Sequence, residues 1–296
     1  MSEPKSIAVI GVGGIGGVLA AVADSCGHRV TLCVRSPLDR LEVEGELGNG
    51  PVRAAIATSP AELEQVDWVF LATKTQDSPA AKPWLDALAG PGTTVLALQN
   101  GVNHRARLEP LVATGVEILP ALVYVNGEVV SRGRVHHRAG NRMVVPAGDR
   151  AELLAALLSP PMEVVPVDDF LTEAWSKMLG NLAASPITAL TGKRLGVLFE
   201  PGVEELALQL IQEAVQVGRA DGAALGEDTG RETFDVFRRF GPETATSMYQ
   251  DRLAGRPLEF EALTGYVVER GHDLGVSTPA HEVVLALLRG AGGADA

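Results

Sequence analysis

A glycine-rich run directly after an apolar segment, near the start of the chain, constrains the fold more than any other feature of the sequence. Residues 7–10 read Ile-Ala-Val-Ile, residues 11–17 contain five glycines, and an alanine-rich segment follows. In the G-x-G-x-x-G spacing, Gly11 permits a tight turn, Gly13 lets the backbone approach a pyrophosphate, and Gly16 lets a helix pack close to the sheet. A helix that begins here would direct its N–H groups and its positive dipole end at the phosphates.

A strand before the glycines and a helix after them is the context that this motif requires. We therefore predict a dinucleotide site formed by Gly11, Val12, Gly13, Gly14, Ile15 and Gly16. The alternative is a glycine-rich turn in another strand–helix unit, because glycine is abundant in this chain.

Length and charge narrow the classes of protein that the chain can belong to. Its 296 residues, 46% hydrophobic and 21% charged, suffice for two domains of ordinary size. The net charge of −12 argues against a nucleic-acid partner and against docking on an anionic membrane. It does not exclude a small anionic substrate, because a local basic pocket can override the overall field.

The two cysteines, Cys26 and Cys33, lie in the first strand–helix–strand segment without a Cys/His cluster around them. Neither a metal site nor a disulfide framework is expected, and reduced thiols are typical of a cytoplasmic protein. The first strand begins too early for a signal peptide, and no apolar run approaches the roughly 18 residues of a membrane span. We therefore expect a soluble, cytoplasmic protein.

The first half of the chain alternates between strand-like and helix-like segments. After the first helix, strands are predicted at 28–34, 52–57, 67–73 and 93–98, and helices at 61–65 and 83–88. This alternation is typical of a doubly wound parallel sheet with right-handed crossovers. From 118 to 145 the pattern becomes richer in strands, with turns expected at Gly127, Gly133 and Gly140.

Helical periodicity dominates after one further strand at 163–167. Amphipathic helices are predicted at 170–190, 202–223, 232–240, 260–274 and 281–288. We therefore predict an α/β chain in which residues 1–168 form a Rossmann-type domain and residues 169–296 form an all-helical second domain.

The end of the second predicted strand distinguishes between the two nicotinamide dinucleotides. A carboxylate there would accept hydrogen bonds from the ribose 2′-hydroxyl of NAD, whereas an arginine accommodates the 2′-phosphate of NADP. The sequence has Arg35 at this place and no carboxylate before Asp39. This favours NADP(H); the alternative is that Arg35 is a solvated charge and that Asp39 contacts the ribose.

Polar side chains follow two further strands of the predicted sheet. Lys74 and Gln76 come directly after the strand at 67–73, and Asn100 follows the strand at 93–98. Ligands of parallel α/β sheets bind at the carboxyl ends of the strands, so these side chains are candidates for the site. The alternative is ordinary polar loop chemistry, and Asn-Gly is a common turn pair.

The first helix of the second domain has a polar stripe on an otherwise apolar surface. Lys177, Asn181 and Ser185 are spaced by four residues, which places them on one face of a helix. Such a stripe needs polar partners, a ligand or solvent. Further along, Ser247 precedes Glu259 and Glu261, of which one carboxylate is expected to face a cleft and the other to cap the helix that follows.

Taken in order, these motifs resemble the ketopantoate reductase family along essentially the whole chain. The resemblance rests on the opening glycines, Lys74, the Gln-Asn-Gly at 99–101, Trp-x-Lys-x-x-x-Asn at 175–181, Ser-Met-x-Gln-Asp at 247–251, Gly-Arg-x-x-Glu at 255–259 and Thr-Pro at 278–279. It implies reduction of the C2 ketone of ketopantoate to pantoate with NADPH, without a metal.

The resemblance also implies roles for particular residues. Lys177 would be the general acid, with Glu259 as its partner across the cleft, and Asn181 and Ser247 would bind or orient the substrate together with Glu259. Lys74 and Asn100 would line the cleft that holds the nicotinamide and the substrate, and Gln76 is counted with the cofactor residues. The first domain would then bind NADP and the second the substrate, a small 2-keto acid.

The chain departs from the family at Ser185, where members usually have an asparagine before proline. Serine is shorter and lacks the two donors of an amide, so the substrate pocket is expected to differ. This favours, as the alternative, a related NADPH-dependent reductase of another 2-keto acid or ketone. A non-catalytic NADPH sensor and a β-hydroxyacid dehydrogenase fit the motifs less well. A homodimer through the helical domain is compatible with its apolar stripes.

Overall fold

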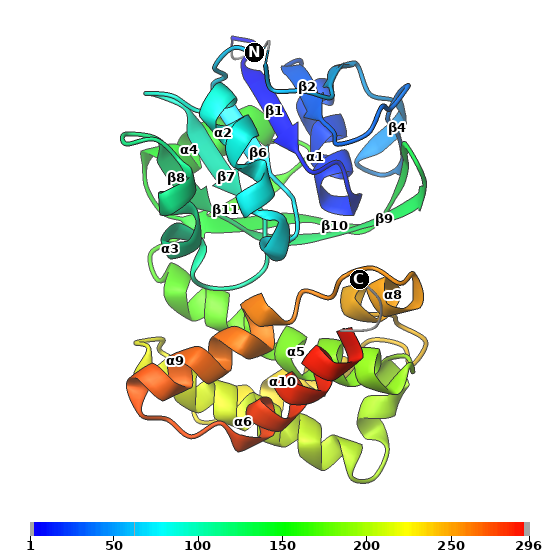
Figure 1. Ribbon diagram of the computed structural model, residues 1–296, viewed down its shortest axis with the longest axis vertical. Helices are drawn as coiled ribbons and strands as arrows, with labels where there is room; N and C mark the ends of the chain where they lie inside the picture. Colours follow the sequence, from blue (N-terminus) through cyan, green and yellow to red (C-terminus); the bar gives the residue numbers. More distant parts are fainter. Residues whose placement is uncertain (1–2, 62, 293–296) are drawn as a thin grey trace. The chain divides into compact units, whose positions relative to one another are not determined.

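The computed structural model describes residues 3–61 and 63–292, which form two compact units (Figure 1). One unit comprises residues 3–99 and 103–170, and the other comprises residues 100–102 and 171–292. The short segment Asn100–Val102 therefore packs with the helical unit although the chain on both sides of it belongs to the first.

A parallel six-stranded sheet is the centre of the first unit. It consists of β1 (Ser6–Ile10), β2 (Arg29–Cys33), β5 (Ala54–Ala57), β6 (Trp68–Leu71), β7 (Thr94–Ala97) and β8 (Glu117–Pro120). The strand order is β5-β2-β1-β6-β7-β8, and every neighbouring pair is parallel. The chain thus winds outward from β1 in both directions, which confirms the doubly wound α/β fold.

Alternate residues of β1 pack into two apolar cores on opposite faces of this sheet. Ile7 and Val9 belong to the core with α1 (Gly14–Ser25), and Ala8 and Ile10 belong to the core with α2 (Lys82–Leu88) and α3 (His104–Leu108). All four are buried, as the period of two in a strand covered on both faces requires.

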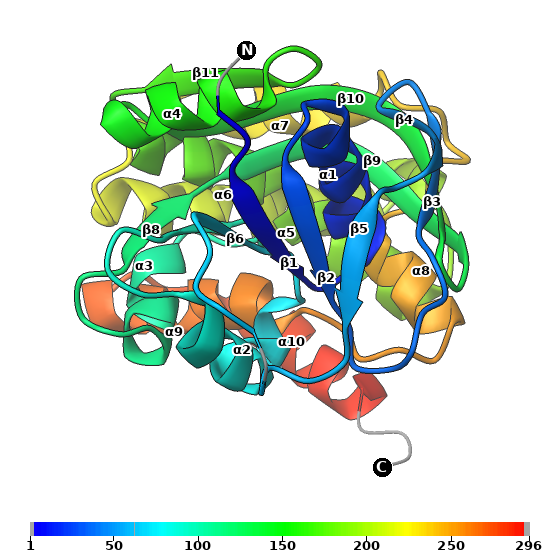
Figure 2. The same cartoon turned by 90° about the horizontal axis from the view of Figure 1, so that it is seen from above.

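A second sheet covers the outer side of α1, as Figure 2 shows. It is formed by β3 (Glu42–Gly45), β4 (Gly48–Pro51), β9 (Leu122–Ser131), β10 (Arg134–Pro146) and β11 (Glu163–Val167). Its order is β11-β10-β3-β4, with β9 antiparallel to β10, and α4 (Asp149–Leu158) packs beside it. Because α1 lies between two sheets, its residues 16–23 are all buried.

Several local predictions differ from the structure of this unit. Residues 61 and 63–65 are not helical, and Glu62 lies outside the described residues. Gly133 lies at the β9–β10 turn, but Gly127 and Gly140 lie inside β9 and β10. A Cβ atom on Gly127 would overlap the backbone of Gly14, so this glycine serves the close crossing of α1 over β9 and not a turn. The short strands β3 and β4 and the helices α3 and α4 were not predicted.

The second unit is helical, as predicted. It contains α5 (Phe170–Thr191), α6 (Val203–Ala220), α7 (Thr229–Phe237), α8 (Ser247–Leu253), α9 (Tyr266–Leu274) and α10 (Pro279–Gly292). Helix α8 was not predicted, and a π-helical turn at Glu261–Gly265 leads into α9. The core includes Trp175 and Leu179 of α5 and Leu210 and Ile211 of α6, all fully buried.

Within the described ranges, none of the helices is both long and apolar enough to cross a bilayer. The same residues contain no group of three or more His, Cys, Asp or Glu side chains suited to a metal ion.

Candidate active site

The turn between β1 and α1 is shaped by glycines that have different tasks. Gly11 has a φ of +95°, and a Cβ atom there would approach the Thr73 nitrogen to 2.6 Å, so only glycine fits beside β6. A Cβ atom on Gly16 would overlap the carbonyl of Gly11. Gly13, in contrast, has no atom within 4 Å of its would-be Cβ, and it precedes α1 without a side-chain cap.

Gly13, directly before the N-terminus of α1, thus has open space beside its backbone, and it follows β1 at the point where the strand order reverses, between β1 and β6. The first N–H groups of a helix have no partner within the helix, and together with the helix dipole they favour an anion. This geometry fits the pyrophosphate of a dinucleotide.

Arg35 lies two residues beyond β2 at the same edge of the sheet. Its guanidinium is largely exposed and comes to 3.9 Å from the carboxylate of Asp77. Asp39, the carboxylate that sequence reasoning considered as an alternative, is also exposed. An accessible guanidinium here suits the 2′-phosphate of NADP.

The loop after β6 carries Lys74 and Gln76. Lys74 is half-buried and begins the short 3₁₀ helix η1 (Thr75–Asp77), and Gln76 is exposed on that helix. The loop is tied down by Gln99, whose Nε2 donates to the Thr73 carbonyl at 3.1 Å, the Lys74 carbonyl at 3.3 Å and Ser78 Oγ at 2.8 Å.

Sequence reasoning missed Gln99 as a residue that positions the site. Its side chain is 5% exposed, and a polar residue that continues an apolar buried strand is the signal that could have identified it. Because one buried amide holds the loop after β6, Lys74 and Gln76 have a defined backbone to project from.

Three predicted residues from distant parts of the sequence meet within the helical unit. The Asn100 amide nitrogen donates to Glu259 Oε2 at 3.1 Å, and Lys177 Nζ donates to Asn100 Oδ1 at a longer 3.4 Å. Since an amide has one donor and one acceptor end, the two contacts fix its orientation. We call Lys177, Asn100 and Glu259 the Lys177 group.

The electrostatics of this group affect the proton on Lys177. Burial lowers the pKa of Lys177 below its ordinary value, and the negative charge of Glu259 opposes that change. A lysine with a lowered pKa gives up its proton more readily than an exposed one, which suits a general acid near neutral pH.

The two carboxylates that follow Ser247 have separate partners. Glu259 contacts Asn100, whereas Glu261 binds the guanidinium of Arg289 in α10 through two contacts of 2.8 and 2.9 Å. Only Glu259 therefore belongs to the Lys177 group, and Glu261 is engaged with α10. In the segment between α8 and Glu259, Arg256 donates to Asp251 Oδ1 of α8 at 2.8 Å.

Asn181 and Ser185 follow Lys177 along one face of α5, a turn apart from each other, as their spacing predicts. Ser185 is buried, with 4% exposure, and precedes Pro186 inside the helix. Ser247 is exposed at the first turn of α8. The Thr188 and Thr246 hydroxyls, 2.7 Å apart, join α5 to the start of α8.

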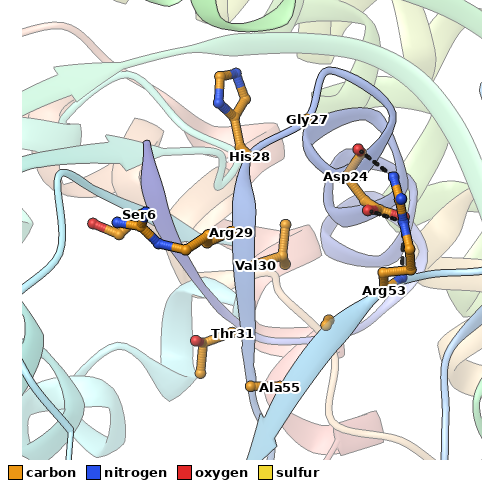
Figure 3. A pocket seen from close by; sticks show the side chains of 10 residues that line it. Ser6, Asp24, Gly27, His28, Arg29, Val30, Thr31, Arg53 and Ala55 are labelled. Carbon is orange, nitrogen blue, oxygen red and sulfur yellow. Dashed lines mark hydrogen bonds and ion pairs between the residues drawn. The ribbon is translucent and has the colours of Figure 1, made fainter. Parts of the chain in front are cut away.

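A pocket on the first unit lies at the opposite edge of the parallel sheet from the glycine turn and Arg35. It is lined by Ser6, Asp24, Gly27, His28, Arg29, Val30, Thr31, Arg53, Ala54 and Ala55, at the amino ends of β1, β2 and β5 (Figure 3). Arg53 is already bound there by Asp24, at 2.9 Å. The glycine turn and Arg35 are at the carboxyl ends, where ligands of such sheets bind.

Comparisons with known proteins cover nearly the whole chain. The family model described as ketopantoate reductase PanE/ApbA matches residues 7–150, and the model of its C-terminal part matches residues 169–292. A curated 2-dehydropantoate 2-reductase of Caulobacter vibrioides is 41% identical over 97% of this chain and 99% of its own length.

Two solved structures have the same fold. A PanE/ApbA family ketopantoate reductase from Ralstonia eutropha JMP134 has a TM-score of 0.87 at 28% identity, over 97% of this chain and 98% of its own. A ketopantoate reductase from Staphylococcus aureus, described as dimeric, has a TM-score of 0.87 at 24% identity with the same coverage.

Proposed function

Because the chain belongs to the ketopantoate reductase family, we propose that it reduces the C2 ketone of 2-dehydropantoate to pantoate with NADPH. Relatives that match nearly the full length support this reaction, which serves pantothenate biosynthesis. The observation that carries the proposal is the Lys177 group, because a ketone under reduction needs a proton donor held beside it.

The chemistry follows from the charges of that group. NADPH, when bound, supplies the hydride, and negative charge then builds on the ketone oxygen. The Lys177 ammonium stabilises that charge and donates the proton that completes the alcohol. Asn100 holds Lys177 and Glu259 in one hydrogen-bonded line, and the Glu259 carboxylate favours the protonated form of Lys177.

The cofactor is proposed to occupy the carboxyl edge of the parallel sheet. The glycine turn at 11–16 would bind the pyrophosphate, and Arg35 would bind the 2′-phosphate. Lys74, Gln76 and Asn100 would contact the rest of the cofactor. The open space at Gly13 supports this assignment, since a bulkier residue there would fill the place of the phosphates. Residues 1–168 would thus form the NADP-binding domain.

The substrate is proposed to contact residues of the helical domain, 169–296. Asn181, Ser185 and Ser247, with Asn100, would bind the carboxylate and hydroxyl of the keto acid. Their amide and hydroxyl groups can donate and accept the hydrogen bonds that such a substrate needs.

A panel of 2-keto acids, assayed with NADPH and with NADH, tests the proposal. We expect the highest kcat/KM for 2-dehydropantoate with NADPH. A purified protein that binds NADPH but does not oxidise it with 2-dehydropantoate would exclude this substrate. A higher rate with another keto acid would favour the second candidate, a reductase of a different substrate, for which Ser185 in place of the family's asparagine is the specific observation.

We also propose that the protein is a cytoplasmic homodimer. Val283 and Leu287, four residues apart on α10, are 61% and 55% exposed, an apolar pair that a second copy could cover. Sedimentation of the protein and of a Leu287→Glu variant tests this, since a dimer through α10 would dissociate in the variant. Cys26 and Cys33 are free thiols in the structure.

A further inference from the structure

Arg35 has a charged neighbour at the place where the ribose is read. Asp77, at the end of η1, has its Oδ2 3.9 Å from the guanidinium of Arg35, and their side chains are 36% and 81% exposed. We propose that Asp77 is a specificity-determining residue, which competes with the 2′-phosphate of NADPH for Arg35 and so limits the preference for NADPH over NADH. This inference rests on the proposed use of NADPH.

The two side chains come from strands that flank β1 on opposite sides. In the order β2-β1-β6, Arg35 follows β2 and Asp77 follows β6, so the glycine turn after β1 lies between their elements. A dinucleotide that places its pyrophosphate on that turn has its ribose 2′ position near the end of β2. The Arg35–Asp77 ion pair therefore occupies the region that distinguishes the two cofactors.

Asp77 is held by the backbone beneath it. Its N–H donates to the Lys74 carbonyl at 3.0 Å, and the same carbonyl accepts from Gln99 at 3.3 Å. Gln99 also donates to Ser78 Oγ, which donates to the Thr75 carbonyl at 2.7 Å. Since Gln99 and Ser78 are buried, the segment that carries the Asp77 carboxylate is fixed before a ligand arrives.

The two charges act in opposite directions on the two cofactors. Arg35 attracts a 2′-phosphate, which carries a charge of about −1.5 to −2 at neutral pH, and Asp77 repels it. With a 2′-hydroxyl in its place, a carboxylate can accept a hydrogen bond instead. Repulsion between unit charges about 4 Å apart in water corresponds to roughly fivefold in a binding constant.

The carboxylate that the sequence offered as the alternative reader of the ribose is Asp39, which follows Arg35 along the chain by four residues. It is Asp77, more than forty residues away, that the fold brings to ion-pair distance of Arg35. A search for an acidic residue confined to the loop after β2 does not find it, because the residue comes from the loop after β6.

Binding measurements on the full chain test the proposal. Dissociation constants for NADPH, NADH, 2′,5′-ADP and 5′-AMP are measured for the unaltered protein, Asp77→Asn and Arg35→Ala. We expect Asp77→Asn to bind NADPH and 2′,5′-ADP about three- to tenfold more tightly and to bind NADH and 5′-AMP no more tightly than before. Arg35→Ala should weaken the binding of NADPH and 2′,5′-ADP only. When Asp77→Asn is combined with Arg35→Ala, its gain should be smaller than in the unaltered protein, because no guanidinium remains to compete for and only direct repulsion is relieved.

Asp86→Asn is the matched control, because it also removes one negative charge from an exposed ion pair of the same unit, that with Lys82 at 2.7 Å. Equal effects of Asp77→Asn and Asp86→Asn would reduce the proposal to a general charge effect and overturn it. Weaker NADPH binding by Asp77→Asn would also overturn it, since Asp77 would then orient Arg35 for the phosphate.

The experiments distinguish a wrong assignment of the function from a wrong assignment of Asp77. Turnover of 2-dehydropantoate with an unchanged NADPH/NADH ratio in Asp77→Asn would contradict only the role of Asp77. A changed ratio in a protein that does not reduce 2-dehydropantoate would contradict only the proposed substrate.

Discussion

The turn between β1 and α1 and the Lys177 group are built in opposite ways. The turn works through backbone, and its glycines are there because side chains at 11 and 16 would collide with neighbouring backbone. The Lys177 group works through side chains that are far apart along the chain. Lys177 follows Asn100 by 77 positions, and Glu259 follows Asn100 by 159 positions. Substitutions in the glycine turn should therefore lower the stability of the protein and its affinity for the cofactor. Substitutions in the Lys177 group should instead change the rate of the chemical step and its pH dependence.

The largest effect is expected for Lys177→Ala. Loss of the general acid should reduce kcat by about 10²–10⁴, with little change in the dissociation constant of NADPH. Steady-state kinetics and cofactor fluorescence measure the two quantities. Lys193→Ala is the matched control, because Lys193 is exposed and pairs with Glu200 at 3.0 Å. A variant Lys177→Ala with more than a tenth of the normal kcat would remove Lys177 from the catalytic role.

Gly11→Ala should affect the other region. A Cβ atom at a φ of +95° and 2.6 Å from the Thr73 nitrogen combines backbone strain with overpacking, which together cost about 2–5 kcal/mol. We expect a lower free energy of unfolding in urea and loss of NADPH binding. Gly92→Ala is the control for strain alone, since Gly92 has a φ of +92° with no atom near its would-be Cβ. Equal destabilisation by the two variants would refute the close packing of Gly11 on the backbone of Ala72 and Thr73, directly after β6.

The pH dependence of the reaction should report on Lys177. The rate should fall as pH rises through the lowered pKa of Lys177, because only the ammonium donates a proton. Glu259 raises that pKa, so Glu259→Gln should move the alkaline limb of kcat/KM to lower pH, by about one unit. Glu261→Gln should leave the limb in place, since Glu261 binds Arg289. If Glu259→Gln moved the alkaline limb to higher pH, Glu259 would not be the group that raises the pKa of Lys177.

The smallest effect is expected for the substrate preference at Ser185. Ser185→Asn adds two amide donors at a buried position of α5 and should change the ratio of kcat/KM between 2-dehydropantoate and other keto acids by about tenfold. Ser176→Asn, on an exposed face of the same helix, should leave the ratio unchanged. An unchanged ranking in Ser185→Asn would show that the departure from the family at this position has no bearing on the substrate.

The central strands of the parallel sheet, β1, β6 and β7, were predictable because each is a short, mostly apolar run that is buried along nearly its whole length. The strands β3 and β4 were not predicted, because their segments are short and poor in apolar residues and take their form from pairing with β10 and with each other. Helix α4 was missed although its segment is rich in Leu and Ala, which favour helices. The boundary at residue 168 stays a prediction. The glycine turn was predicted from the spacing of its glycines together with the strand before them and the helix after them. The common face of Lys177, Asn181 and Ser185 was predicted from their four-residue spacing.

Local sequence determined the parts of this protein in which neighbours along the chain act together. Strand, glycine turn and helix N-terminus occupy consecutive residues, so the spacing of Gly11, Gly13 and Gly16 predicted the turn that is proposed to bind the cofactor. Tertiary structure decided which of Glu259 and Glu261 contacts Asn100, that Gln99 holds the loop after β6, and that Asp77 faces Arg35. These choices depend on where separate elements meet, and neither periodicity nor spacing carries that information.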